Sequence, residues 1–146
     1  MTIPRNLKSR INQGCFAALA THTNSNDIQN HLMWIDYEDE NFLINTEQER
    51  KKTENIRLKS TLTLLIFSPK QMYESWEIRG SVVDIKQGGD ANKHIDKLSQ
   101  LYIGKPYKRQ EGTSWDEGNI KDREIWIIKP NTIFSMSSLG SQPNSE

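Results

Sequence analysis

A cluster of basic and polar side chains between residues 46 and 55 is the part of this sequence best suited to chemistry. The cluster consists of Thr46, Arg50, Lys51, Lys52 and Asn55. It comes directly after the apolar segment 42–44, so a predicted strand leads straight into a predicted helix. Free backbone N–H groups and the positive end of the helix dipole gather at such a helix start, where phosphate binds well. The pattern therefore indicates a phosphate-binding site.

The three consecutive basic residues are not equivalent. Arg50 offers a planar fork that binds two phosphate oxygens at once, whereas Lys51 or Lys52 adds a compact charge. Successive helical residues point about 100° apart, so all three cannot face one ligand. A capped surface helix that also contains Glu47 and Glu49 explains the same pattern, and these acids would weaken an anion site. The residues alone leave both interpretations open.

The elements around this cluster follow from periodicity and turn residues. Apolar and β-branched segments predict strands over 15–23, 28–37, 42–44, 61–67, 73–86, 123–129 and 131–136, the last two separated by Pro130. Helical spacing predicts helices over 4–13, 47–58 and 91–103. Thr46, with Glu49 three residues later, has the capping-box pattern for the second helix, and Asp90 is placed to cap the third. Six or seven strands with short helices predict a mainly β, antiparallel barrel.

Composition restricts the class of protein. The 146 residues fit one domain, expected over 1–136, and the small polar segment 137–146 is expected to fray as a flexible tail. The formal net charge is zero, which does not favour a nucleic-acid or membrane partner. Apolar runs such as residues 64–67 are far too short to span a bilayer, and the N-terminus lacks a signal-peptide pattern. The single cysteine, Cys15, fits a reducing compartment, so a cytoplasmic location is expected.

The cluster also resembles a known family signature. Thr46, Arg50, Lys52 and Asn55 match a Thr, then Gly-Arg-x-Lys, then Asn-Leu, with Glu49 in place of the Gly and Ile56 in place of the Leu. This signature is typical of the pyridoxamine-phosphate-oxidase-like split barrels, in particular the branch that uses the deazaflavin coenzyme F-420. Further landmarks follow in the same order, over roughly residues 7–135: segments 16–21, 31–34, 77–82 and 102–105, and Arg123.

The resemblance implies a split β-barrel that binds F-420 or FMN. Arg50 and Lys52 would hold the cofactor phosphate, Thr46 would supply a hydroxyl, and Lys51 is a possible substitute. The strand residues that would lie along the ring system are His31, Leu32, Met33 and Trp34. Members of this family are homodimers with cofactor sites at the interface, so a homodimer is expected here.

The expected activity is that of an oxidoreductase which transfers hydride to or from a small organic substrate. Because the cofactor itself carries the hydride, no acid–base triad and no catalytic side chain are expected, and no His pair has metal-ligand spacing. A non-catalytic flavin-binding or sequestering protein of the same fold is the alternative. A third reading, an oligonucleotide-binding barrel, is disfavoured by the zero net charge and the lack of a basic aromatic strand face.

The remaining candidate residues have both structural and functional interpretations. His31 could approach the ring or simply pack beside Trp34, and Arg79 could pair across strands, contact a second subunit or neutralise a cofactor tail. Asn55 is expected to bond backbone near the helix end. The other expectations are surface positions for His22 and His94, a buried small hydrophobe at Cys15, and either substrate cover or packing for Tyr107 and Trp115.

Overall fold

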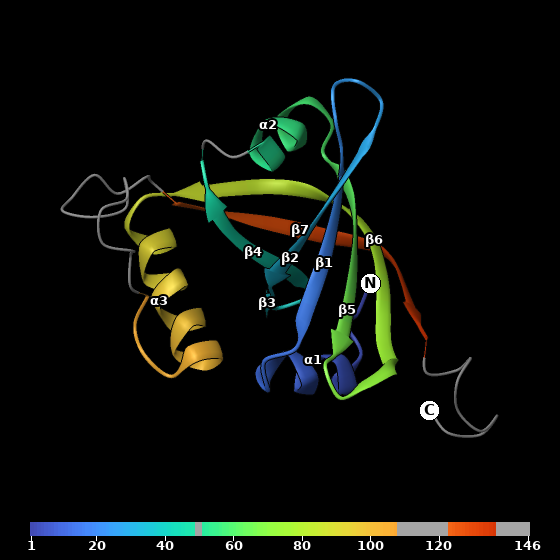
Figure 1. Cartoon of the computed structure of the whole chain (residues 1–146), viewed down its shortest axis with the longest axis vertical. Helices are drawn as coiled ribbons and strands as arrows, with labels where there is room; N and C mark the ends of the chain where they lie inside the picture. Colours follow the sequence, from blue (N-terminus) through green and yellow to red (C-terminus); the bar gives the residue numbers. More distant parts are fainter. Residues whose placement is uncertain (49–50, 108–122, 137–146) are drawn as a thin grey trace.

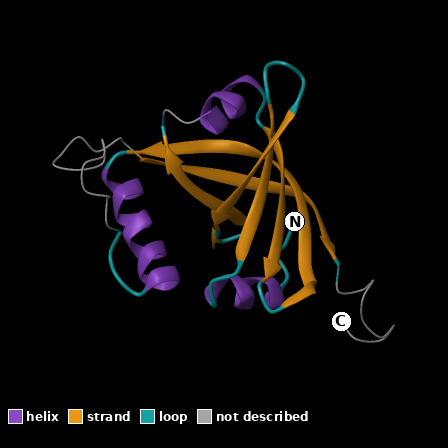
Figure 2. Ribbon diagram, viewed as in Figure 1, coloured by secondary structure: helices purple, strands orange, loops and turns teal. Residues whose placement is uncertain are grey.

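A computed structural model describes residues 1–48, 51–107 and 123–136. Seven antiparallel strands form one sheet, in the order β2-β1-β5-β6-β7-β4-β3 (Figures 1 and 2). Their bounds are β1 Phe16–His22, β2 Ile28–Trp34, β3 Asp36–Glu38, β4 Asn41–Glu47, β5 Thr61–Ser68, β6 Gln71–Gln87 and β7 Arg123–Ser135. The helices are α1 Arg5–Asn12, α2 Lys51–Leu58 and α3 Gly89–Ile103. The antiparallel, mainly β architecture predicted from the sequence is confirmed.

The two edges of the sheet meet at Ile35. The edge strands β2 and β3 are consecutive in the chain and only Ile35 separates them, so the sheet must curl until its edges adjoin. The prediction of one strand over 28–37 is wrong at this residue. The Ile35 side chain is fully buried, and its backbone N–H donates to the Tyr102 hydroxyl at 3.1 Å. The chain therefore turns from one sheet edge to the other around a side-chain partner supplied by α3.

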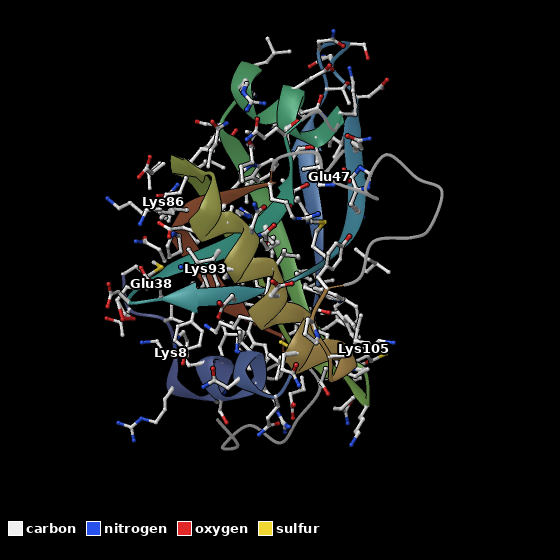
Figure 3. The ribbon with its side chains drawn as sticks, turned by 90° about the vertical axis from the view of Figure 1, so that its left-hand side faces the viewer. Lys8, Glu38, Glu47, Lys86, Lys93 and Lys105 are labelled. Atoms are coloured by element: carbon white, nitrogen blue, oxygen red, sulfur yellow. The ribbon has the colours of Figure 1, made fainter. Side chains whose placement is uncertain are left out.

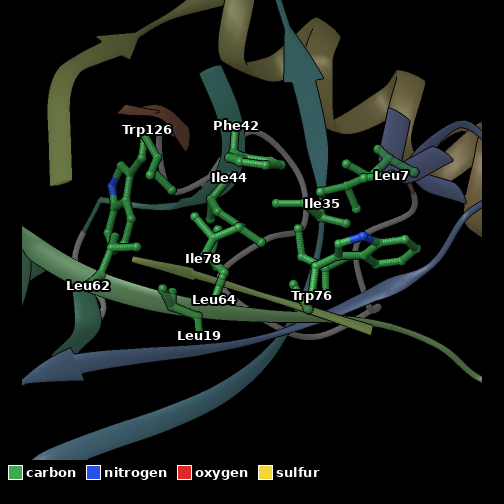
Figure 4. Close-up of a cluster of buried hydrophobic side chains, with 14 of the residues drawn as sticks. Leu7, Leu19, Ile35, Phe42, Ile44, Leu62, Leu64, Trp76, Ile78 and Trp126 are labelled. Carbon is green, nitrogen blue, oxygen red and sulfur yellow. The ribbon is translucent and has the colours of Figure 1, made fainter. Parts of the chain in front are cut away.

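The barrel interior is filled by one apolar cluster (Figure 4). On β1, odd-numbered residues such as Ala17 and Leu19 are buried and even-numbered residues are half-buried, as the two-residue strand period requires. Trp76 and Trp126 lie at opposite ends of the cluster (Figure 4). Helix α1 packs Leu7 against it, which confirms the first predicted helix. Each large side chain buried here contributes about 1.5–3 kcal/mol of transfer free energy.

The segment around Thr46 differs from its prediction. Strand β4 continues through Thr46, which pairs with Glu124 on β7 and is 2% exposed. Thr46 is therefore a strand residue, and its prediction as the N-cap of a helix over 47–58 is wrong. Glu49, the other half of the predicted capping box, lies outside the described residues. The long-range β4–β7 pairing decides this conformation, and the local capping pattern contains no information about it.

Two further expectations about element ends are wrong. Strand β7 runs without interruption through Pro130, because the facing strand β6 shifts register between Arg79 and Gly80. A Cβ atom on Gly80 would lie 2.4 Å from the Lys129 carbonyl oxygen, so glycine permits this close approach. Helix α3 begins at Gly89 with Gly88 as its N-cap, and Asp90 lies within the first turn. Its predicted end is confirmed, since Gly104 has a left-handed φ of 85°.

Candidate binding site

A pocket of about 390 Å³ opens beside the edge strand β2. Its lining residues come from four strands, two helices and one loop: Phe16, His31, Leu32, Met33, Trp34, Asn45, Thr46, Glu47, Lys52, Ile95, Tyr107 and Arg123. Six of the eight residues predicted to bind a cofactor are therefore brought together, and their contact with a cofactor stays a prediction. Lys51 is not among the lining residues. Arg50, the remaining one, lies outside the described residues.

One wall of the pocket is aromatic and apolar. The Trp34 ring stacks on the Tyr102 ring with centroids 5.0 Å apart and an angle of 6° between their planes. Tyr107 meets the same indole edge-on at 6.5 Å, and Phe16 lies 5.7 Å from the Tyr102 ring. Such aromatic contacts hold the Trp34 ring in one orientation. This wall therefore offers a rigid, flat surface from β1, β2 and the segment after α3.

A second part of the pocket lining is charged. Lys52 is only 4% exposed and Glu47 only 6% exposed, and both line the pocket. Figure 3 shows Glu47 at the end of β4, in a view onto α3. Lys51, one residue earlier, instead forms an ion pair with Glu54 at 3.5 Å, and its side chain is about half exposed. A buried lysine that lines a pocket is a candidate anion-binding group.

Two side chains of helix α2, Asn55 and Arg57, attach the helix to the barrel and so determine the position of Lys52. The Asn55 amide donates to Gln29 Oε1 at 2.8 Å and to Thr21 Oγ1 at 3.2 Å. Arg57 pairs with the fully buried Glu124 carboxylate at 2.9 Å. The expectation that Asn55 bonds backbone is wrong, because it bonds side chains on β1 and β2. The helix orientation that points Lys52 inward thus depends on residues far away in the sequence.

A buried polar network lies beneath the pocket. Arg123 Nε donates to Asn45 Oδ1 at 2.6 Å, and the Asn45 amide donates to the Ala91 carbonyl at 2.7 Å and lies 3.1 Å from His94 Nδ1. His94 Nε2 lies 2.9 Å from Asp36 Oδ2. The expectation of a surface position for His94 is wrong, since it is 9% exposed. Its helical spacing from Ala91 and Leu98, three before and four after, was the signal for a buried face.

Asp36 remains a carboxylate within this network. Burial tends to raise the pKa of Asp36, but hydrogen bonds from His94 and from the Tyr37 N–H outweigh it, together with the Lys97 charge. The pKa of Asp36 therefore lies below its usual value. Lys97 Nζ lies 3.2 Å from the same carboxylate oxygen that faces His94. The network thus has a fixed negative end on β3 and a positive end at Arg123 on β7.

Comparison with known proteins gives a result at the level of structure alone. No protein-family model matches the chain, and no curated protein matches it either. Among solved structures, a protein described as an F420 reductase superposes with a TM-score of 0.75 at 22% identity, over 91% of this chain and 99% of the other. A putative pyridoxamine 5'-phosphate oxidase from Listeria innocua gives 0.62 at 17% identity, over 91% and 97%. The chain is a pyridoxamine-phosphate-oxidase-like split barrel in fold.

A third solved structure has the same fold and is described as FMN-binding. A pyridoxamine 5'-phosphate oxidase-related, FMN-binding protein from Nostoc punctiforme superposes with a TM-score of 0.61 at 12% identity, over 91% of this split barrel and 84% of that chain. Sequence identities this low establish the fold and leave the ligand open. Within the described part of this split barrel, no helix is long and apolar enough to cross a membrane.

Arg79 and His22 lie away from the pocket. Arg79 is exposed and forms an ion pair with Glu77 of the same strand, at 3.0 Å. It faces the outer surface of β6, and neither it nor His22 lines the site. This ion pair lies within one strand, whereas the structural interpretation of Arg79 was a pair across strands or a subunit contact. His22, expected at the surface, is partly exposed.

Cys15 is a buried thiol with low reactivity. Desolvation raises the pKa of Cys15 from 9.0 to about 11. The thiolate fraction near pH 8 is then about a hundredfold smaller than for an unperturbed thiol, because each pKa unit is a factor of ten. We expect iodoacetamide to alkylate native Cys15 at least a hundredfold more slowly than in urea-unfolded protein, as measured by mass spectrometry. Equal rates would contradict the burial of this side chain.

Proposed function

We propose that this chain binds a flavin-type cofactor, F-420 or FMN, in the pocket beside β2 and acts as an oxidoreductase. The observation that supports this most is the pairing of a flat aromatic wall with a buried lysine in one pocket. A planar ring system suits the wall formed with Trp34, and a phosphate suits Lys52. The volume of about 390 Å³ lies in the range of small-molecule sites. The solved structures of similar fold include proteins described by these cofactors.

The residues present fit such a group in three ways. Thr46 and Lys52 would hold the phosphate end, with Arg50 as a further predicted contact. The β2 residues His31 to Trp34 would lie along the ring, and among the described strands β2 is an edge of the sheet that pairs with β1 alone. When bound, the cofactor supplies hydride transfer. The protein's part is to bind, to orient the ring and to exclude water, and the aromatic wall performs the last of these.

The outer face of the sheet supports a homodimer as part of this proposal. One row of residues crosses five strands on that face: Leu32, Ala18, Leu65, Glu77 and Phe134. Leu32 is 73% exposed, Phe134 is 47% exposed and Leu65 is 41% exposed. Three exposed apolar side chains thus share one row of the sheet, with Glu77 between Leu65 and Phe134, and exposed apolar groups of this kind favour a protein interface. Leu32 also lines the pocket, so a second copy on this face would border the cofactor site.

Leu65→Arg tests the dimer. Leu65 lies on the central strand of the row, so a charge there would be buried in the interface, at a cost of several kcal/mol. We expect a shift from dimer to monomer by light scattering, with cofactor affinity lowered about tenfold or more. Lys86→Glu, a charge change at an exposed position on β6 outside the row, is the control and should leave the dimer intact. A wild-type protein that is monomeric at 50 μM would exclude this arrangement.

Titration with each cofactor tests the function itself. Purified protein is titrated with FMN and with F-420, followed by absorbance and fluorescence of the cofactor, and the absorbance and mass of any copurified molecule identify a natural ligand. We expect micromolar or tighter binding of one of them. No binding of either would refute the proposal. With cofactor bound, reduction of a quinone or dye by the reduced cofactor indicates an oxidoreductase, and no turnover indicates the sequestering protein.

A further inference from the structure

His94 lies at the centre of a chain of polar side chains that ends at the pocket. Its Nε2 is 2.9 Å from Asp36 Oδ2 on β3, and its Nδ1 is 3.1 Å from Asn45 Nδ2 on β4. Asn45 Oδ1 accepts from Arg123 Nε on β7 at 2.6 Å. The last two members, Asn45 and Arg123, line the pocket, whereas His94 and Asp36 lie behind them. The chain therefore connects α3 to a pocket residue with a permanent positive charge.

The direction of each hydrogen bond in this chain is determined. Arg123 has only donors, so the Asn45 atom that faces it is the carbonyl oxygen. The Asn45 NH₂ then points to α3, where one hydrogen goes to the Ala91 carbonyl at 2.7 Å. The other hydrogen is directed at His94 Nδ1, which must accept it through a lone pair. His94 is then neutral with its hydrogen on Nε2, which donates to the Asp36 carboxylate.

We propose that His94 is a positioning residue whose neutral form locks the Asn45 amide and thereby orients the Arg123 guanidinium toward an anionic group of the ligand. Protonation of His94 releases this lock. A hydrogen on Nδ1 would face the Asn45 NH₂, and the amide cannot turn over to accept it. A turned amide would direct NH₂ at Arg123 and its oxygen at the Ala91 carbonyl. The inference rests on the proposed cofactor pocket and adds Arg123 to its anion-binding groups.

The charged groups around His94 have opposite effects on the protonation of its imidazole. Asp36 on β3 favours the protonated imidazole, whereas Lys97 on α3 and Arg123 on β7, reached through Asn45 on β4, oppose it. Glu47 on β4, which pairs with Arg123 across the strands, again favours it. Ligand affinity should therefore depend on pH through His94.

Nuclear magnetic resonance tests the lock without any ligand. In ¹⁵N-labelled protein, a long-range ¹H–¹⁵N correlation spectrum identifies which His94 nitrogen bears the hydrogen. We expect the Nε2–H tautomer at pH 8, and an Arg123 Nε–H resonance that shifts with the same midpoint as His94 on acidification. An Nδ1–H tautomer, a charged ring at pH 8, or an Arg123 resonance that does not follow His94 would overturn the proposal.

Binding measurements test the consequence. FMN affinity is measured from pH 8 to 5.5 for the wild type and for His94→Gln, which retains an acceptor and a donor but cannot be charged. Over this range we expect the wild-type affinity to fall about tenfold more than that of the variant. The FMN phosphate affects both proteins equally, so the difference between their two pH profiles reports on His94 alone. His22→Gln, a histidine outside the network, should behave as the wild type.

The two measurements separate failure of this inference from failure of the proposed function. Parallel pH profiles for wild type and His94→Gln would overturn the inference while leaving FMN binding intact. Absence of FMN binding at every pH would refute the FMN form of the proposed function, and the ligand-free spectra would still decide whether His94 locks Asn45 and Arg123. If His94→Gln does not fold, the wild-type spectra serve the same purpose.

Discussion

Lys52→Met is expected to weaken cofactor binding by about 10- to 100-fold, or about 1.4–2.8 kcal/mol. Methionine keeps the apolar stem and removes only the charge that would meet the phosphate. The Glu47 carboxylate, which lines the same pocket, remains and repels an anion. Replacing a buried charge with an apolar side chain is often neutral for folding, so the melting temperature should change by a few degrees at most.

Lys51→Met is the matched control. Lys51 is the neighbouring residue with the same side chain, but it is about half exposed, pairs with Glu54 and does not line the pocket. Its change should alter cofactor affinity less than twofold, because exposed ion pairs contribute little. Isothermal titration of both variants at one salt concentration makes the comparison. Equal losses in the two variants would mean that the cluster acts as a diffuse charge and that the pocket is not the phosphate site.

Tyr102→Phe is expected to lower the free energy of unfolding by about 2–4 kcal/mol. The Tyr102 hydroxyl accepts the Ile35 N–H at 3.1 Å and donates to the Cys15 carbonyl oxygen. Its removal leaves these two backbone groups without that partner, and each unsatisfied buried group costs about 1–3 kcal/mol. Burial raises the pKa of Tyr102 above its usual value, so this hydroxyl keeps its hydrogen and donates in the folded protein at pH 7.

The matched control is Tyr37→Phe, because the Tyr37 hydroxyl only accepts from the Asn12 amide near the surface. We expect this variant to lose less than about 1 kcal/mol. Amide hydrogen exchange provides the specific readout. In Tyr102→Phe the Ile35 amide should exchange faster than the β5–β6 amides, since it lies at the seam between the sheet edges. Uniform acceleration across the sheet would indicate a general loss of stability without a role at the seam.

Local patterns were sufficient for most of the strands and for helix ends. The run of small, largely apolar residues in segment 15–23 predicted β1, and Gly104 marked the end of α3 because glycine readily adopts the positive φ found there. The polar end of β4 at Thr46 could not be predicted in this way. Its strand conformation comes from pairing with Glu124, which is 78 residues later in the sequence. Local signals describe only what neighbouring residues favour.

The candidate site could be predicted only in part, because local signals do not show how distant elements pack against one another. Helical geometry required that the consecutive basic residues face different directions, but it did not determine which of them faces inward. That choice depends on how Asn55 and Arg57 dock α2 on distant strands. His94 was missed because its polarity outweighed its position on the apolar face of α3. Glu47 was taken for a helical surface residue because the end of β4 was misplaced.

The pairing of β4 with β7 has a consequence for how this protein folds. Phe42 and Ile128 are partners although 86 residues separate them in the sequence, whereas β1–β2 and β5–β6 are local hairpins. Non-local pairing of this kind is slow, on a timescale of about milliseconds to seconds. The chain loses the entropy of closing the long loop before the stabilising strand contacts can form. The pocket needs Asn45 and Glu47 from β4 and Arg123 from β7. A folding intermediate with only the two local hairpins therefore has no complete pocket, and cofactor capture should coincide with the final, rate-limiting step.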